Sequence, residues 1–375
     1  MAVLEVTSAW KSLTSKEKLY VHWLSKACWA GAPIVFHQVS PESPLLFALF
    51  QRLLSVQSIE SLMLDSGVTS EESRAFLNYV STFYGNMGNF LSFGDTKFTP
   101  NLSKESFRRI IEASSARGKL KDEIQTLLDL VIDDVYSLDE KQRMLDYPEA
   151  GVSMYYSSNV SKRDIELVNT FMAKCGISPY NTRLFKSLDG KLNLRIACGL
   201  HGNKAPQSFP LEDGLELIVS YGDYDNHLKD VSEELKKSAE FVANDHERDM
   251  IHHYIRHFLE GDIEFHKEAQ RSWIKNVQPA VETNIGFIES YRDPSGVRGE
   301  FEGFVAVVNK ETSRKFSSLV TNAPRFLSKL PWPPEYEKDK FLKPDFSSLE
   351  VVTFAASGIP AVLFLPSFVI HFSGY

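Results

Sequence analysis

The order of the hydrophobic patterns along the chain constrains its fold most. Apolar residues recur at helical spacing through much of the first half and again in two later tracts, Leu228 to Val242 and Ile251 to Leu259. Three segments between about Lys191 and Val308 instead follow patterns typical of strands: KLNLRIACG, LELIVSYGD and EFEGFVAVVN. Helices that dominate the first half, with strands gathered later, predict an α+β fold.

The clearest helix start is at Thr14. Thr14 and Glu17 have the spacing of a capping box, in which each side chain accepts a hydrogen bond from the backbone N–H of the other residue. Apolar residues follow at helical spacing as far as Cys28. Because glycine weakens a helix and proline removes a backbone donor, we expect this helix to end at Gly31 and Pro33.

Charge and hydropathy exclude two classes of partner. The chain of 375 residues carries a net charge of −8 at pH 7 and has a pI near 5.8, without a cluster of Lys and Arg. We therefore expect neither nucleic acid nor a membrane as a partner, because nucleic acid and anionic membrane surfaces attract clustered positive charge. The longest apolar run, AVLFLPSFVI, is interrupted by Pro366 and is shorter than the ~20 residues that a membrane span needs.

Cysteine usage indicates a reducing compartment. Cys28, Cys175 and Cys198 are widely spaced and form no Cys-x-x-Cys pair, so the sequence suggests neither a disulfide framework nor a thiolate zinc site. The first residues, MAVLEVTSAWKS, include an acidic residue and lack the apolar run of a secretory signal. We expect a cytoplasmic protein.

Several long segments carry a family resemblance. They are GFIESYRDPSGVRGEFEGFVAVVN from Gly286 to Asn309, YGNMGNFLSFGDTKFTPN from Tyr84 to Asn101, YYSSNVSK from Tyr155 to Lys162, and the stretch from Leu330 to Ala361. Together they resemble the dipeptidyl peptidase III family, the zinc metallopeptidases of family M49. The resemblance implies an exopeptidase that releases dipeptides from the N-termini of short peptides.

The resemblance also implies a two-lobed architecture. Its lower lobe has a small β-barrel core surrounded by helices, and its upper lobe is largely helical and holds the zinc. Carried over by position, residues 1–310 form the lower lobe with the substrate wall, and residues 311–361 begin the upper catalytic lobe. Residues 362–375 depart from the family pattern, and we interpret them as a divergent apolar tail.

Zinc is the cofactor that the resemblance implies, and its first motif is a His-Glu-x-x-Gly-His helix. Peptide hydrolysis at zinc needs three protein ligands and a carboxylate that takes a proton from the bound water. The motif does not occur in the 375 residues. The nearest approach is His246-Glu247, but His252 follows one position too late. We therefore expect this chain to lack the metal ligands and the general base, as a form truncated before the zinc helix would.

The family's other zinc motif, Glu-Glu-x-x-x-Glu/Asp, is approached only by Glu71 and Glu72. Phe76 stands where the last carboxylate would be. We interpret the two glutamates as the first turn of a helix, where negative charge is favourable.

His253 and His257 have the i, i+4 spacing that places two imidazoles on one helix face. The apolar stripe from Ile251 to Leu259 is expected on the opposite side. We therefore interpret the pair as a polar face that contacts water or a neighbouring loop, and not as a metal site.

Glu289 and Tyr291 are the candidate substrate-binding residues. They are two positions apart before the turn Asp293-Pro294-Ser295-Gly296, so in an extended strand their side chains project to the same side. The resemblance implies that Glu289 binds the free α-amino group of a peptide and that Tyr291 donates to the scissile carbonyl oxygen. From the residues alone, an exposed strand pair without function is the alternative.

Three functions follow from these observations. The first is a truncated dipeptidyl peptidase III that is inactive by itself. The second is a non-catalytic lobe that binds peptides or a protein, and the third is an unstable product of an incorrect gene model. Short peptides are the partners that the resemblance implies, whereas protein partners stay unspecified.

Overall fold

The computed structural model describes residues 6–200, 204–337 and 347–358. The predicted tail, residues 362–375, lies outside the described residues. Helices and strands both contribute, as the α+β prediction requires. The helices are α1 (Thr7–Lys11), α2 (Ser15–Val39), α3 (Ser43–Val56), α4 (Ile59–Ser66), α5 (Ser70–Asn86), α6 (Lys104–Glu112), α7 (Lys119–Tyr136), α8 (Lys162–Cys175), α9 (Asp225–Ser238), α10 (Asp245–Glu260), α11 (Ile263–Trp273), α12 (Lys310–Thr321) and α13 (Ala323–Leu327).

The strands of the described residues form two open sheets. The first contains β1 (Thr182–Lys186), β2 (Leu192–Ala197), β4 (Glu216–Asp223) and β3 (Gln207–Pro210), in that spatial order, with β2 and β4 parallel. The second contains β5 (Val281–Glu289), β6 (Glu300–Val308) and β7 (Leu349–Ala355), all antiparallel. The three predicted strands are confirmed as β2, β4 and β6. The expected closed barrel is not confirmed, because no sheet closes within the described residues.

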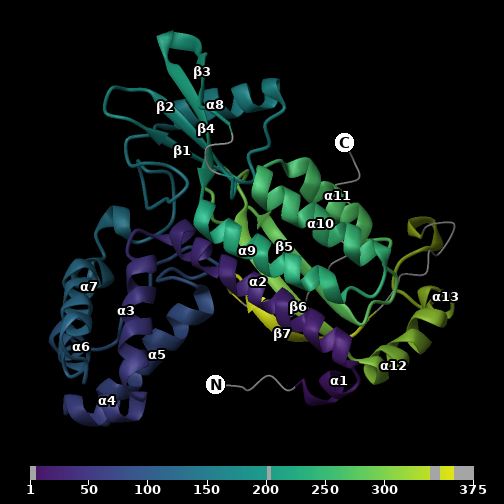
Figure 1. Ribbon diagram of the computed structural model, residues 1–375, viewed down its shortest axis with the longest axis horizontal. Helices are drawn as coiled ribbons and strands as arrows, with labels where there is room; N and C mark the ends of the chain where they lie inside the picture. The colour runs from purple at the N-terminus through teal and green to yellow at the C-terminus, as the bar shows by residue number, and fades with distance from the viewer. Residues whose placement is uncertain (1–5, 201–203, 338–346, 359–375) are drawn as a thin grey trace.

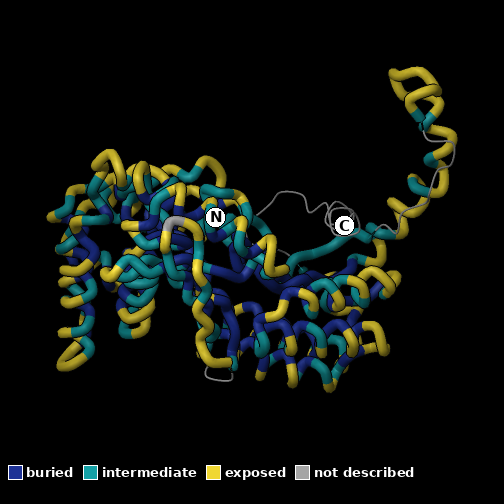
Figure 2. Tube along the Cα trace, turned by 90° about the horizontal axis from the view of Figure 1, so that it is seen from above, coloured by how far each residue is buried: buried dark blue, intermediate teal, exposed yellow. Residues whose placement is uncertain are grey.

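One hydrophobic core joins the N-terminal helices to the second sheet. Helix α2 packs across β6 and β7 and lies beside α9, with α10 and α11 following (Figure 1). The central strand β6 is buried on both faces along most of its length, which explains its almost unbroken apolar sequence. A smaller core lies between α8 and the first sheet. Residues 310–337, which include α12 and α13, project from the body as an exposed arm (Figure 2).

Helix α2 begins as predicted but ends later. The capping box is present, with Thr14 N donating to Glu17 Oε2 at 2.6 Å and Glu17 N donating to Thr14 Oγ1 at 3.2 Å. The predicted end at Gly31 and Pro33 is wrong, because the helix runs on to Val39 with Pro33 inside it.

Burial explains why α2 continues through its proline. A proline inside a helix costs about 3 kcal/mol. Beyond it the helix buries four apolar side chains, each worth roughly 1.5–3 kcal/mol; they are Ile34, Val35, Phe36 and Val39, all at most 1% exposed. Gly31 has a separate role. A Cβ atom there would overlap the ring of Phe301 on β6, so the glycine allows the helix to approach the sheet closely.

Candidate functional site

The ends of β5 and β6 place Glu289 and Glu300 side by side. The two strands pair in antiparallel register, and this register shifts between Phe287 and Glu289, so that Glu289 lies directly opposite Glu300. Such irregularities re-aim side chains at the end of a ladder. The backbones of two glutamates from different strands are therefore paired at this end of the sheet, and both carboxylates act on Glu302.

The segment after β5 is fixed by Asp293. As the sequence predicts, residues 293–296 form a turn, with Gly296 N donating to Asp293 O at 2.8 Å. The Asp293 carboxylate accepts from Val297 N at 3.1 Å, Arg298 N at 2.9 Å and the Tyr156 hydroxyl at 2.6 Å. A carboxylate that accepts several backbone N–H groups holds the loop in one conformation.

Two buried arginines, Arg292 and Arg298, hold this loop in place through hydrogen bonds and an ion pair. Arg298 is fully buried and donates to the Tyr156 hydroxyl at 2.8 Å. Arg292 forms an ion pair with Glu300 in which Nε and Oε1 are 3.0 Å apart, and it also donates to Asn86 O at 3.2 Å. Arg292 therefore ties the strand end to the C-terminal end of α5 and offsets the charge of Glu300.

No ion pair involves Glu289 among the residues that the structure describes. Partial burial raises the pKa of the Glu289 carboxyl, and a hydrogen bond with Tyr291 lowers it by less. Burial, followed by the charges of Glu289 and Glu300, holds the pKa of Glu302 well above its usual range. Because Glu300 is paired with Arg292 and Glu302 strongly favours its neutral form, Glu289 is the carboxyl group of the three that is left to pair with a cation.

The side chains of Tyr291 and Glu289 are in contact, as their spacing predicts, although Tyr291 lies beyond the end of β5. Tyr291 as a whole is 64% exposed, and its hydroxyl donates to the Glu289 carboxylate. Sequence reasoning missed Arg292, Glu300 and Glu302. The acidic residues of the segment EFE at the start of β6 were the available signal, because facing residues in paired strands share one side of the sheet.

The described residues contain no group of three or more His, Cys, Asp and Glu side chains that could hold a metal ion. His246 and His252 are exposed residues of α10, whereas Glu247 between them is buried. The side chains within the described ranges therefore form no set that fits a zinc site. Glu71 and Glu72 occupy the first turn of α5, as interpreted from the sequence, and Glu72 completes a capping box with Thr69.

The interpretation of His253 and His257 as a solvated pair is wrong for His257. His257 is 1% exposed, and its Nδ1 donates to Asp262 O at 3.0 Å. Its ring lies 5.4 Å, between centroids, from that of His266, which is 3% exposed. Burial lowers the pKa of His257 to about 4 and that of His266 to about 3. The α10–α11 interface covers this face of the helix, which the apolar stripe did not reveal.

None of the helices in the described part of the chain is long and apolar enough to cross a membrane.

Three comparisons place the chain among known proteins. The model of "Peptidase family M49" matches residues 127–370. The chain is 47% identical over 366 residues to dipeptidyl peptidase 3 of Dictyostelium discoideum and 44% identical over 379 residues to that of Homo sapiens. These alignments cover 97% of this chain but 52% and 51% of the relatives, so the chain spans about half of their length.

A solved structure shares the fold. The structure of DPP III from Caldithrix abyssi matches with a TM-score of 0.55 at 15% sequence identity. The match covers 92% of this chain and 49% of that one. At this identity the likeness concerns the fold alone.

Proposed function

Because the chain belongs to peptidase family M49, we propose that the end of β5 binds the N-terminal end of a short peptide for a dipeptidyl peptidase. In this proposal the peptide's α-ammonium group donates to the Glu289 carboxylate in place of Tyr291, and the released Tyr291 hydroxyl donates to a carbonyl oxygen of the peptide. The observation that carries the proposal is that Glu289 has no ion-pair partner among the described residues, whereas Arg292 is already paired with Glu300.

The electrostatics of the site support a cationic ligand group. An ammonium group beside Glu289 stabilises the ionised carboxylate and offsets the burial that raises its pKa. The buried Arg292 does not compete for Glu289, because its guanidinium is held by Glu300, Asn86 and Ser357. Because Asp293 already holds the loop after β5 in one conformation, ligand binding loses less conformational entropy.

Calorimetric titration of the 375-residue chain with the tetrapeptide Val-Val-Tyr-Pro and with its N-acetylated form tests the proposal. We expect the free-amine peptide to bind more tightly, because acetylation removes the charge. Glu289→Gln should weaken binding of the free-amine peptide by about 2 kcal/mol, or roughly 30-fold, and leave binding of the acetylated peptide unchanged. Equal binding of both peptides to the unmodified chain would contradict the role of Glu289.

We also propose that the chain by itself does not hydrolyse peptides, since the sequence holds no His-Glu-x-x-Gly-His motif. Release of naphthylamine from Arg-Arg-naphthylamide, with and without added zinc, tests this. Zinc-dependent release would show that a complete metal site forms and would leave the amine-binding proposal intact.

The lobes and the location stay proposals. We assign residues 1–310 to the lower lobe, 311–361 to the start of the upper lobe, and 362–375 to a separate tail. Strand β7, in the second of these segments, pairs with β6, so the chain returns to the lower sheet after the exposed arm. We propose a cytosolic location on the cysteine pattern alone.

A further inference from the structure

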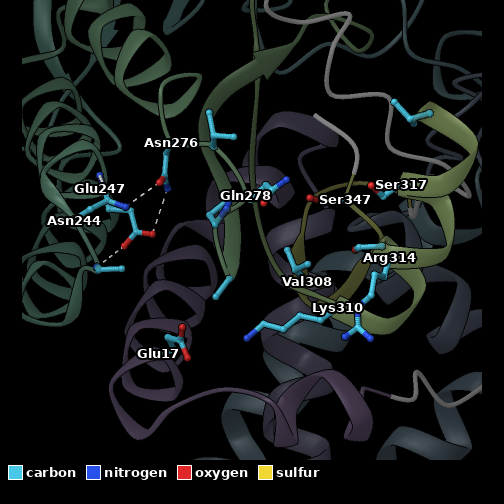
Figure 3. A pocket seen from close by; sticks show the side chains of 16 residues that line it. Glu17, Asn244, Glu247, Asn276, Gln278, Val308, Lys310, Arg314, Ser317 and Ser347 are labelled. Atoms are coloured by element: carbon cyan, nitrogen blue, oxygen red, sulfur yellow. Dashed lines mark hydrogen bonds between the residues drawn. The ribbon is translucent and has the colours of Figure 1, made fainter. Parts of the chain in front are cut away.

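A pocket lies at the other end of β5 and β6 from Glu289. Ala280 and Val308 are part of its lining, and its volume is about 680 Å³ (Figure 3). Pockets of roughly 300–1,000 Å³ are typical of small-molecule sites. Because β5 has 9 residues, about 27 Å separates this pocket from Glu289. The proposed amine site and this pocket are therefore distinct.

One wall of the pocket is cationic. Lys310 and Arg314 are four residues apart in the first turns of α12, so they share a face of that helix. Neither forms an ion pair within the described ranges, whereas Lys315 is paired with Glu311 at 2.9 Å. Ser317 adds a hydroxyl to the same wall. This wall can bind a carboxylate by charge-assisted hydrogen bonds.

The facing wall is acidic. Glu247 of α10 is 3% exposed, and its carboxylate accepts from Ala243 N at 2.6 Å and from Asn276 Nδ2 at 3.2 Å. Both donors are neutral, and no described cation pairs with Glu247. A buried carboxylate without a cation is costly, and a bound cation would offset that cost. Figure 3 shows Glu247 and Asn276 on the side opposite Lys310 and Arg314.

The lining between the two walls is partly apolar. It includes Val277, Pro279, Val308 and Val320. A simple anion would contact only the Lys310 wall, and a simple cation only the acidic part of the lining, which includes Glu17 as well as Glu247. A molecule with both charges and an apolar body complements the whole pocket.

We propose that this pocket binds a short zwitterionic peptide, with its ammonium group toward Glu247 and its carboxylate toward Lys310 and Arg314. The inference goes beyond the proposed function, because it uses none of the residues of the amine site. It gives the chain a second site of the same ligand class, in which both ends of a small peptide are recognised.

The test is calorimetric titration of the 375-residue chain with the dipeptide Val-Val, N-acetyl-Val-Val and Val-Val-amide at pH 7. All titrations use the Glu289→Gln background, so that the amine site does not contribute. We expect Val-Val to bind at least about tenfold more tightly than either blocked form, since each lacks one charge. Equal affinity for the three ligands, or no measurable binding of Val-Val, would overturn the proposal.

Variants assign the binding to the pocket. Lys310→Met combined with Arg314→Met should weaken Val-Val binding at least about tenfold and leave Val-Val-amide binding unchanged, because the amide lacks the carboxylate. Lys315→Met, on the same helix but outside the lining, is the matched control and should have no effect. Val-Val affinity that is the same in the double variant and in the control would reject the site.

Glu247→Gln tests the acidic wall, since glutamine keeps an acceptor for Ala243 N. It should weaken Val-Val and Val-Val-amide and leave N-acetyl-Val-Val unchanged. Its thermal midpoint is measured alongside, and the comparison with the N-acetylated ligand separates lost charge recognition from lost folding. A uniform loss for all three ligands would overturn the role of Glu247.

Discussion

Arg292 and Glu300 form a buried ion pair at the end of the second sheet, with Nε and Oε1 3.0 Å apart and side chains that are 1% and 8% exposed. Glu289 lies directly opposite Glu300 in the strand register. Glu300 is therefore paired with a cation inside the protein, whereas Glu289 has no ion-pair partner among the described residues and can accept one from a ligand. This division supports the assignment of amine binding to Glu289 and of a structural role to Glu300.

Arg292→Met should destabilise the chain. The substitution leaves Glu300 buried without its cation, and breaking a buried pair in this way costs about 3–5 kcal/mol. Arg292→Met combined with Glu300→Gln should recover much of that loss, because the uncompensated charge is gone. Urea unfolding followed by circular dichroism measures both. Equal losses in the single and double variants would show that the ion pair itself contributes little.

Tyr291→Phe should shift the pH dependence of peptide binding and leave stability nearly unchanged. The hydrogen bond from Tyr291 lowers the pKa of Glu289, so its removal raises that pKa. Because only the ionised carboxylate binds the ammonium group well, affinity increases as pH rises through this pKa, and the variant needs a higher pH. Tyr291 is 64% exposed, so the unfolding free energy should change by less than about 0.5 kcal/mol.

The carboxyl resonance of Glu289 in a ¹³C NMR titration gives the pKa directly, and Glu289→Gln identifies the signal. Tyr336→Phe, another exposed tyrosine, is the control and should leave the titration in place. A Glu289 titration that is the same with and without the Tyr291 hydroxyl would contradict the coupling.

Local sequence patterns predicted the helices and strands of this fold better than they predicted the contacts between them. The capping box at Thr14 and the strand segments depend on near neighbours in sequence, and both are confirmed. The path of α2 through Pro33 and the burial of His257 depend on partners far along the chain, which no local pattern contains.

The candidate site shows the same difference between local features, which the sequence predicts, and long-range contacts, which it does not. The spacing of Glu289 and Tyr291 predicted that they meet, but their electrostatics depend on Arg292 and on the β5–β6 register. A register is fixed by the whole sheet and its covering helices, so the facing of Glu289 and Glu300 could not be derived from spacing.

Gly31→Ala should destabilise the contact between α2 and β6. The new methyl group would overlap the ring of Phe301, which is fully buried, and overpacking of this kind costs about 1–3 kcal/mol. Gly85→Ala in α5 is the matched control. A Cβ atom there meets nothing within 4 Å, so alanine should stabilise the helix by about 0.5–1 kcal/mol.

Thermal and urea unfolding of the two variants should therefore move in opposite directions. A gain in stability for Gly31→Ala similar to that of Gly85→Ala would mean that α2 and β6 separate easily, and that close packing does not explain the glycine within the helix.

The pair His257 and His266 should make the fold sensitive to mild acid. Burial lowers the pKa of His257 to about 4 and of His266 to about 3, while in the unfolded chain a histidine titrates near ~6.5. As pH falls below ~6.5 the unfolded chain therefore binds protons that the folded chain does not, and each histidine lowers the unfolding free energy by up to about 1.4 kcal/mol per pH unit. The stability is fully present above ~6.5 and is lost as pH falls toward the folded pKa values.

Replacing one ring tests this origin of the acid sensitivity. His266→Phe keeps a planar ring near Gly286 without a titrating group, so the loss of stability per pH unit between pH 6.5 and 4.5 should fall by roughly half of the histidine contribution. His252→Gln, at an exposed position of the same region, should leave that slope unchanged. Urea midpoints across this pH range measure the slopes. If His266→Phe keeps the full slope, the acid sensitivity comes from other groups, and the neutral buried pair is not what the low pH disrupts.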